Sequence, residues 1–131
     1  MRSLILMILF MVGCSSSESV KPPTPTPVSG DIFLSNGQPM PAGRITFNPK
    51  DNGLPEATAE INNGSFQLTS FKKNDGVVPG DYVITVEPIT YLNGTAKRVN
   101  VLVPLHYQKV ATSRLNVTIK DGQQPLTIRL Q

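Results

Sequence analysis

Side chains that could carry out catalysis are scarce in this chain. Its 131 residues include one histidine, His106, and one cysteine, Cys14. A histidine that acts as a general base needs a nucleophile and an orienting group within hydrogen-bond reach. Ser113 and Asp121 could fill those roles for His106, but nothing in the sequence brings the three residues together. We therefore expect His106 to lie in a surface loop and the protein not to be an enzyme.

Residues that could bind a metal or a cofactor are also scarce. One histidine and one cysteine exclude any site built from several His or Cys ligands. Calcium prefers about six to eight oxygen ligands and closely spaced acidic residues, whereas Asp51, Asp75 and Asp81 stand far apart in expected loops. No glycine-rich loop opens a helix to hold a phosphate. The sequence predicts neither a metal nor a cofactor.

Aromatic residues in expected exposed positions could bind a glycan or a peptide. Phe71, Tyr91 and Tyr107 fall in expected loops, and Phe33 lies on the outward register of an expected strand. Such rings can serve as stacking platforms for a glycan or a peptide. They can equally cap the ends of a domain, and aromatic residues make up only 6% of the chain with no tryptophan. Both interpretations stay open.

Charge gives no sign of a nucleic-acid partner. The chain has 12 Lys and Arg against 9 Asp and Glu, a formal net charge of +3, spread without a run. Nucleic-acid surfaces usually cluster their basic residues on one face. We expect no nucleic-acid binding.

The N-terminus has the order of a secretory signal. Arg2 precedes an unbroken apolar stretch from Leu4 to Val12, and Gly13 and Cys14 follow. A positive start, a short apolar region and a small residue before a cleavage point are typical of signal peptides. Nine residues of helix extend only about 14 Å, whereas a membrane span needs about 20 residues. The segment 1–13 is therefore predicted to be a signal peptide.

The four residues Met11–Cys14 resemble the lipobox of bacterial lipoproteins, in which Leu is more usual than Met11. That resemblance implies cleavage before Cys14, lipidation of its thiol and attachment to a membrane of the cell envelope. Two or more acyl chains hold a protein firmly at a bilayer. Ser15, in place of an acidic residue, implies the outer membrane if the cell has two membranes. An ordinary signal peptide with an incidental cysteine is the alternative.

Residues 14–27 are predicted to form a tether. Ser15–Ser17 is a short polar segment, and Lys21–Pro27 contains four prolines in seven residues. Proline fixes φ and favours the extended polyproline II conformation, which reaches about 20 Å over seven residues. Proline-rich segments can also be ligands for aromatic grooves. After a lipid anchor, a stalk that lifts a domain off the membrane is the better interpretation.

Seven segments after Val28 alternate apolar and polar residues with the period of two that is typical of strands. The apolar positions are Gly30, Ile32 and Leu34; Ile45 and Phe47; Ala57, Ala59 and Ile61; Phe66 and Leu68; Tyr82, Ile84 and Val86; Leu115, Val117 and Ile119; and Leu126, Ile128 and Leu130. Turn pairs such as Asn63-Gly64 separate them. Residues 28–131 are predicted to be an all-β domain, a seven-stranded antiparallel β-sandwich. Pro88–Ser113 is expected to be irregular, with Val99–Val103 as an edge strand open to a partner.

Several of these segments resemble the carboxypeptidase regulatory-like domain, which has a transthyretin-like β-sandwich fold. They are Val28–Ile32, Gly37–Phe47, Asn63–Leu68 and Pro79–Val86, the last reading PGDYVITV. Pro104–Thr118 looks like the tail of small lipoproteins of planctomycete-type bacteria. The resemblance covers residues 28–131. Its motifs are turns and strands, and the related hydrolases of 5-hydroxyisourate carry several histidines and a C-terminal Tyr-Arg-Gly-Ser that this chain lacks.

The functional expectation follows from the anchor and the domain together. We expect a lipid-anchored protein of the cell envelope that displays one β-sandwich for structural or adhesive contact with an envelope protein or glycan. The alternative is a glycan- or peptide-binding module that uses Phe71, Tyr91 and Tyr107. A fold does not by itself specify a function, so a site must decide between them.

Overall fold

The computed structural model describes Gly13 and residues 23–131, and these form nine strands and one short 3-10 helix, η1. The predicted signal peptide before Gly13, the predicted lipidation residue Cys14 and the first part of the predicted tether lie outside the described residues. The elements are β1 (Ser29–Phe33), β2 (Ala42–Pro49), β3 (Ala57–Asn62), β4 (Ser65–Gln67), β5 (Gly80–Glu87), β6 (Ile89–Leu92), β7 (Thr95–Arg98), η1 (Leu105–Gln108), β8 (Leu115–Ile119) and β9 (Leu126–Arg129).

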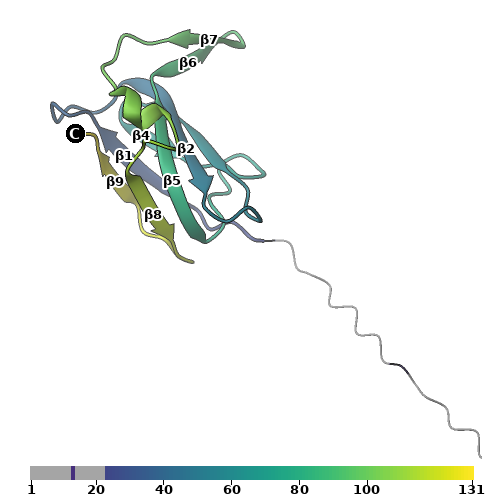
Figure 1. Cartoon of the computed structure of the whole chain (residues 1–131). Coiled ribbons are helices and arrows are strands. Elements are labelled where there is room, and N and C mark those ends of the chain that lie inside the picture. Colours follow the sequence, from purple (N-terminus) through teal and green to yellow (C-terminus); the bar gives the residue numbers. More distant parts are fainter. Residues whose placement is uncertain (1–12, 14–22) are drawn as a thin grey trace, which may run out of the picture.

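Seven of the strands form one sheet in the order β8-β5-β2-β3-β4-β1-β9. Each of the seven overlaps one of the segments predicted from the alternating pattern, so the all-β prediction is confirmed. The sheet curls until its two edge strands, β8 and β9, face each other across a gap of about 240 Å³ (Figure 1). No ladder joins β8 to β9 among the described residues.

The prediction that every strand pair is antiparallel is wrong at one place. β9 pairs with β1 in parallel, from Gly30 opposite Leu126 to Phe33 opposite Arg129. The other neighbours in the sheet are antiparallel. Across the antiparallel ladders of the sheet, β8 runs opposite to β1, and the chain reverses between β8 and β9 over the short segment 120–125, so β9 runs beside β1 in the same direction. The sheet is therefore mixed.

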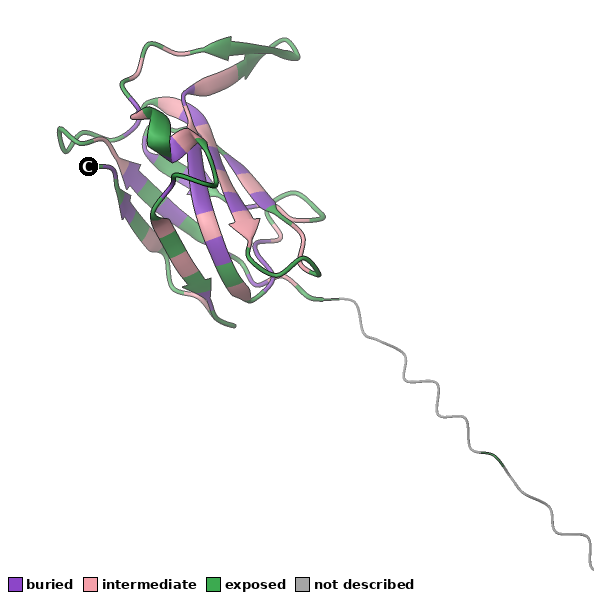
Figure 2. Ribbon diagram, in the orientation of Figure 1, coloured by how far each residue is buried: buried purple, intermediate pink, exposed green. Residues whose placement is uncertain are grey.

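The core lies on the inner face of this curled sheet. Alternate residues of β2 and β3 are buried, which gives the strands the striped pattern of Figure 2. Tyr82 is fully buried in this core, with its ring centroid 6.1 Å from that of Phe47. The Tyr82 hydroxyl donates a 2.6 Å hydrogen bond to the Val78 carbonyl oxygen, and desolvation by burial raises the pKa of this tyrosine. This hydrogen bond avoids the free-energy cost of burying an unpaired hydroxyl, so the whole tyrosine side chain can lie in the core.

The folded domain begins slightly earlier than the predicted boundary at Val28. Thr26 is buried and pairs with Val77 through two backbone hydrogen bonds of 2.9 Å. The Thr26 hydroxyl oxygen also accepts a hydrogen bond from the Gly122 amide. Gly76 has φ of +102° and packs directly on the Thr26 carbonyl, where a Cβ atom would clash. Thr26 and Pro27, which the sequence predicts to be part of the tether, thus belong to the domain.

The segment Pro88–Ser113, which was expected to be irregular, contains a hairpin and a 3-10 helix. β6 and β7 pair in antiparallel fashion around a two-residue turn in which Asn93 and Gly94 have φ of 53° and 76°. Positive φ at both positions is what a type I′ turn requires. Val99–Val103, the expected edge strand, forms no strand. Within residues 13 and 23–131, no helix is long and apolar enough to cross a membrane.

The hairpin and the N-terminal segment lie at opposite ends of the domain (Figure 1). Thr26 bonds to Val77, three residues before β5 begins, and the hairpin follows directly after β5 ends at Glu87. The eight residues of β5 extend about 26 Å at ~3.3 Å per residue. We call the end with Thr26 the proximal end and the end with the hairpin and η1 the distal end.

Candidate functional site

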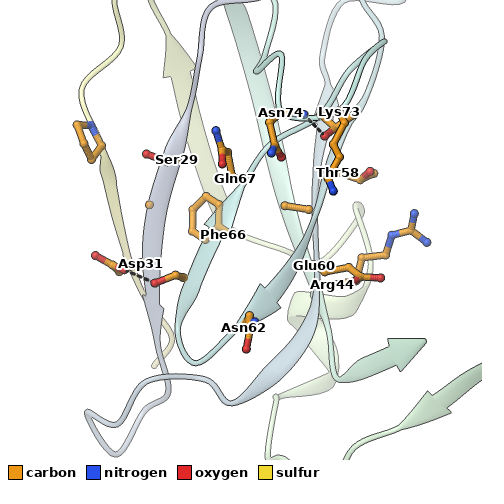
Figure 3. Close-up of a pocket in the computed structure, with 15 residues that line it drawn as sticks. Ser29, Asp31, Arg44, Thr58, Glu60, Asn62, Phe66, Gln67, Lys73 and Asn74 are labelled. Carbon is orange, nitrogen blue, oxygen red and sulfur yellow. Dashed lines mark hydrogen bonds between the residues drawn. The ribbon is translucent and has the colours of Figure 1, made fainter. Parts of the chain in front are cut away.

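A hollow opens on the sheet where β3 and β4 separate. Asn62 pairs with Ser65 beside the turn, and Thr58 pairs with Thr69 further along. Glu60 and Gln67 lie midway in the same register, yet no ladder pair joins them. The separation leaves a groove of about 750 Å³, and Figure 3 shows polar side chains from both strands along it. We call this the β3–β4 groove.

The β3–β4 groove is polar and carries balanced charge. Its ionisable side chains are Arg44 and Lys73 on one hand and Asp31 and Glu60 on the other. Their formal charges cancel, two positive against two negative. The Ser65 hydroxyl donates a 3.2 Å hydrogen bond to the Asp31 carboxylate (Figure 3). Amide and hydroxyl groups, such as those of Asn62, supply further donors and acceptors.

The only aromatic ring in the groove lining, that of Phe66, is buried. Phe66 is 4% exposed, and its ring packs over Gly30, where a Cβ atom would lie 2.6 Å from Phe66 Cζ and would clash with the Leu126 carbonyl oxygen. Gly30 is thus needed for Phe66 to fill the space beneath the groove. The groove therefore offers hydrogen bonding to a polar ligand but no aromatic surface for stacking.

Phe71, the first predicted binding residue, is 58% exposed in the loop between β4 and β5. The loop is wound around the carboxylate of Asp75, which accepts backbone hydrogen bonds from Ser70 (2.8 Å), Phe71 (3.0 Å) and Lys72 (2.8 Å). Partial desolvation would raise the pKa of Asp75, but these donors outweigh it and hold the pKa below its usual value. The hydrogen bonds to Asp75 thus fix the backbone of the loop that exposes Phe71.

Tyr91, the second predicted residue, is 41% exposed on β6. Its hydroxyl oxygen accepts a 2.8 Å hydrogen bond from Arg44 Nη1 of β2, and the Arg44 guanidinium carbon lies 5.3 Å from the ring centroid. A cation at this distance from a ring is attracted to it. Tyr91 therefore attaches the hairpin to the main sheet as well as presenting part of its ring to solvent.

Tyr107, the third predicted residue, is not an exposed loop aromatic, and in this respect the prediction is wrong. Its ring is 6% exposed and belongs to the core. Its hydroxyl oxygen accepts a 3.0 Å hydrogen bond from the Gln131 amide. Tyr107 is the buried residue of the short helix η1, which turns its ring into the core. A helix of four residues is too short to leave a periodic pattern in the sequence, so the burial of Tyr107 could not be predicted. Tyr107 holds η1 and the C-terminal strand together.

Phe33 lies on the outer face of the sheet, as its register predicts. It is half-buried on β1, and the guanidinium carbon of Arg129 on β9 lies 4.7 Å from its ring centroid. The ring is thus covered by a neighbouring arginine. It adds no free stacking surface.

The three residues considered for catalysis are not brought together. His106 is exposed on η1 at the distal end, its ring 4.0 Å from that of Tyr107. The Ser113 hydroxyl is buried and donates to the Ile84 carbonyl oxygen. Asp121 follows β8 at the proximal end, so the length of β8 separates it from His106. Residues 13 and 23–131 hold no group of three His, Cys, Asp or Glu side chains placed to bind a metal.

The distal end carries apolar side chains that the sequence analysis did not single out. Leu92, Leu102, Leu105 and Val110 are 52%, 82%, 73% and 51% exposed. We call these four residues, together with Tyr91, the distal surface. Leu102 lies within Val99–Val103, which the sequence predicts to be an edge strand, whereas no alternating pattern includes Leu92, Leu105 or Val110. Their exposure became visible only in the three-dimensional structure.

Charge is one-sided in the segment that runs from the hairpin through β8. No Asp or Glu occurs in residues 88–120, whose five basic residues are Lys97, Arg98, Lys109 and Arg114, toward the distal end, and Lys120, at the proximal end. Arg114, Arg129 and His106 line one shallow hollow of about 490 Å³ beside η1. The sequence does contain this signal, because the gap between Glu87 and Asp121 can be read directly from it.

The described residues thus present separate surfaces rather than one converging site. Phe71 lies near the proximal end and Tyr91 at the distal end, so the predicted aromatic residues do not form a common platform. The β3–β4 groove is a third surface, along which Glu60 of β3 and Gln67 of β4 lie (Figure 3). Comparison with protein-family models, with curated proteins and with solved structures finds no match for this chain.

Proposed function

We propose that this chain is a lipid-anchored protein of the cell envelope whose β domain makes contact with another envelope component and catalyses no reaction. The proposal joins the lipobox-like residues Met11–Cys14 to a domain of the carboxypeptidase regulatory-like, transthyretin-like type. The signal and the anchor rest on the sequence. The contact role rests on the arrangement of the folded domain.

The observation that carries the proposal is the opposition of the two ends. The chain that follows Cys14 joins the domain at Thr26, at the proximal end, and the exposed residues of the distal surface lie about the length of β5 away. An anchor at Cys14 would therefore hold the proximal end toward the membrane. The distal surface would then face away from the membrane, where a partner can reach it.

The chemistry of the distal surface supports contact rather than catalysis. Large exposed apolar patches mark interaction sites, and four large apolar side chains are exposed at this end of the domain. Leu102 and Leu105 expose most of their surface to water, and burying such a side chain in an interface gains about 1.5–3 kcal/mol. A partner that covered both residues would remove this apolar area from water.

Two structural features support the transthyretin-like assignment of the domain. The segment Pro79–Val86 that carries the resemblance contains most of β5, which pairs with both β2 and β8. The turn Asn63-Gly64, with which the resembling segment Asn63–Leu68 begins, joins β3 to β4. Both motifs thus occupy positions where the sheet needs them.

The anchor is tested by replacing Cys14 with serine and labelling the protein with a radioactive or alkyne-bearing fatty acid. The full chain should incorporate label, sediment with membranes and lose both properties in Cys14→Ser. Ser17→Ala is the matched control and should behave as the unaltered chain. Equal labelling of Cys14→Ser and the unaltered chain would contradict the anchor.

A second candidate function is favoured by the β3–β4 groove. Its balanced charge and its alternating donors and acceptors suit an uncharged, hydroxyl-rich ligand such as a neutral glycan. Binding of neutral oligosaccharides on an array should then be lost in Glu60→Ala and Gln67→Ala, whose side chains project along the groove. Retention of array binding in both variants, or its loss in Leu102→Ser, would exclude the groove as the glycan site.

A further inference from the structure

The outer edge of β7 is free to pair with another strand. β6 and β7 form a separate two-stranded sheet, and no other described strand pairs with either of them. Every residue of β7 is exposed. A strand edge of this kind presents a row of unpaired backbone donors and acceptors.

The register of the hairpin identifies the free groups. Val99 donates to the Pro88 carbonyl oxygen at 2.9 Å, and the residues of β6 and β7 pair in sequence from there to the turn. In an antiparallel pair, only alternate residues direct their N–H and C=O groups at the partner strand. Lys97 therefore bonds toward β6, whereas the backbone groups of Ala96 and Arg98 point away from it, toward the open side.

The basic side chains of β7 determine which kind of strand can pair with its free edge. Lys97 and Arg98 belong to the acid-free segment 88–120, and these adjacent residues project from opposite faces of the strand. An incoming strand with acidic side chains would meet a positive group on either face. Cross-strand pairs of opposite charge stabilise a sheet, whereas like charges opposite each other destabilise it.

The same argument excludes a second copy of this chain as the occupant. If β7 paired with β7 of another copy in antiparallel fashion, Lys97 and Arg98 of both copies would gather on one short ribbon. Lysine on an exposed edge is a recognised obstacle to such self-pairing. The occupant must therefore be a different chain with the opposite charge.

The hairpin is held in position for this role. Arg44 bonds to Tyr91 on the face that turns toward β2, and Ala96 and Arg98 share that face by register. The other face carries Leu92, which is 52% exposed, next to Thr95 and Lys97. An apolar residue of an incoming strand could pack on Leu92 while its acidic neighbours approach the basic side chains.

We propose that β7 binds an extended, acidic segment of a partner protein as a third strand of the β6–β7 sheet. This inference rests on the proposed contact function of the distal end and names its partner chemistry. Main-chain hydrogen bonds to Ala96 and Arg98 supply affinity, and the charges of Lys97 and Arg98 supply selectivity. Two-stranded hairpins are marginally stable alone, so a third strand would also make the hairpin more rigid.

The test uses an acetylated six-residue peptide of alternating Glu and Val as the probe, with the Lys and Val peptide as its counterpart. The protein is the full chain carrying Cys14→Ser in mild detergent, so the result does not depend on lipid attachment. The acidic peptide should bind at least about tenfold more tightly than the basic one. Hydrogen exchange at the Ala96 and Arg98 amides should slow, while the already bonded Lys97 amide should change less.

Two variants separate backbone pairing from charge. Ala96→Pro removes an N–H that the hairpin itself does not use, since edge strands accept proline where the N–H faces solvent, and it should lose at least tenfold in affinity. The double charge reversal Lys97→Glu and Arg98→Glu should reverse the preference between the two peptides. Lys50→Glu with Lys120→Glu, at the proximal end, makes the same change in net charge and should bind as the unaltered chain.

Three results would overturn the proposal. Equal affinity for the two peptides would show that charge does not select the strand. Undiminished binding by a folded Ala96→Pro chain would show that the β7 edge is not used. Protection of amides elsewhere in the domain, with none at Ala96 and Arg98, would place the peptide at another site. Anchoring and exposure of the distal surface would stand in each case, because they are measured separately.

Discussion

Arg44 on β2 holds Tyr91 on β6 in two ways, by a 2.8 Å hydrogen bond to the hydroxyl oxygen and by a guanidinium carbon 5.3 Å from the ring centroid. The two residues are 47 positions apart in the chain. One side-chain pair thus joins the projecting hairpin to the outer face of the main sheet. The hairpin's orientation depends on this pair, because β7 is exposed along its whole length.

Loss of the Tyr91 hydroxyl should loosen the hairpin without unfolding the domain. Tyr91→Phe removes the hydrogen bond and keeps the ring, whereas Arg44→Ala removes both contacts. Amide hydrogen exchange of the bonded residues Thr90 and Lys97 should become several-fold faster in Tyr91→Phe and faster still in Arg44→Ala. The free energy of unfolding should change by less than about 1 kcal/mol in Tyr91→Phe, since the pair is partly exposed. Unchanged exchange in both variants would contradict the role of this contact.

Replacement of Asp75 should destabilise the Phe71 loop in a pH-dependent way. Asp75→Asn weakens three backbone hydrogen bonds to a charged acceptor and should cost about 1 kcal/mol near pH 7 in urea unfolding, the exposure of the loop keeping the loss small. Because the pKa of Asp75 is lower in the folded state, its carboxylate stabilises the fold at pH above its ordinary pKa. That stabilisation is lost as pH falls through the lowered pKa.

The difference between the unaltered chain and Asp75→Asn should therefore be full at neutral pH and shrink in acid. Asp121→Asn is the control for removal of one negative charge from an exposed turn. A difference that grew as the pH fell would contradict the assignment, as would a control variant that reproduced the whole effect.

A methyl group at Gly30 should disturb the packing beneath the β3–β4 groove. The added Cβ would meet the Leu126 carbonyl oxygen and the Phe66 ring, so Gly30→Ala should lower the free energy of unfolding by about 1–3 kcal/mol. Ser29→Ala, an exposed change on the same strand, should stay within about 0.5 kcal/mol. Equal thermal stability of the two variants would show that the close approach at Gly30 carries no energetic weight.

The two parts of the Tyr107 side chain should contribute differently to stability. Tyr107→Phe removes only the hydroxyl, which accepts a 3.0 Å hydrogen bond from the Gln131 backbone amide and donates one of 3.4 Å to the Gln131 carbonyl oxygen, and should cost about 1 kcal/mol. Tyr107→Ala also empties a buried site and should cost about 3–5 kcal/mol. Neither change should alter peptide binding in a chain that remains folded. A Tyr107→Phe variant of full stability that loses binding would restore Tyr107 as a binding residue.

The seven strands of the main sheet could be predicted because each has one buried face. In β3, for example, Ala57, Ala59 and Ile61 are buried and alternate with less buried residues. The apolar and polar residue types therefore alternate along the sequence with a period of two. The turn at Asn63-Gly64 was equally visible, since both residues take positive φ. Local patterns of this kind report burial and turns without knowledge of the partner strand.

What remained hidden depends on contacts between distant residues. The parallel pairing of β9 with β1 leaves no local trace, because an antiparallel strand would show the same alternation. β7 is exposed throughout and therefore lacks any pattern, although Asn93-Gly94 is the turn pair that could have revealed the hairpin. Likewise, the β3–β4 groove arises where Glu60 and Gln67 fail to pair, a feature that neither residue type predicts.

The central claim is that the chain is attached at Cys14 and makes contact through its opposite end. Cys14 is the only natural cysteine, so single cysteines introduced as Leu102→Cys and Lys120→Cys can be probed with a maleimide in open envelope fragments and again after detergent solubilisation. The account predicts that the Cys14 thiol is blocked in the unaltered chain, that Leu102→Cys is protected until solubilisation and that Lys120→Cys reacts in both conditions. A reactive Cys14 thiol in the unaltered chain, or equal reactivity of the two introduced cysteines in intact fragments, would contradict it.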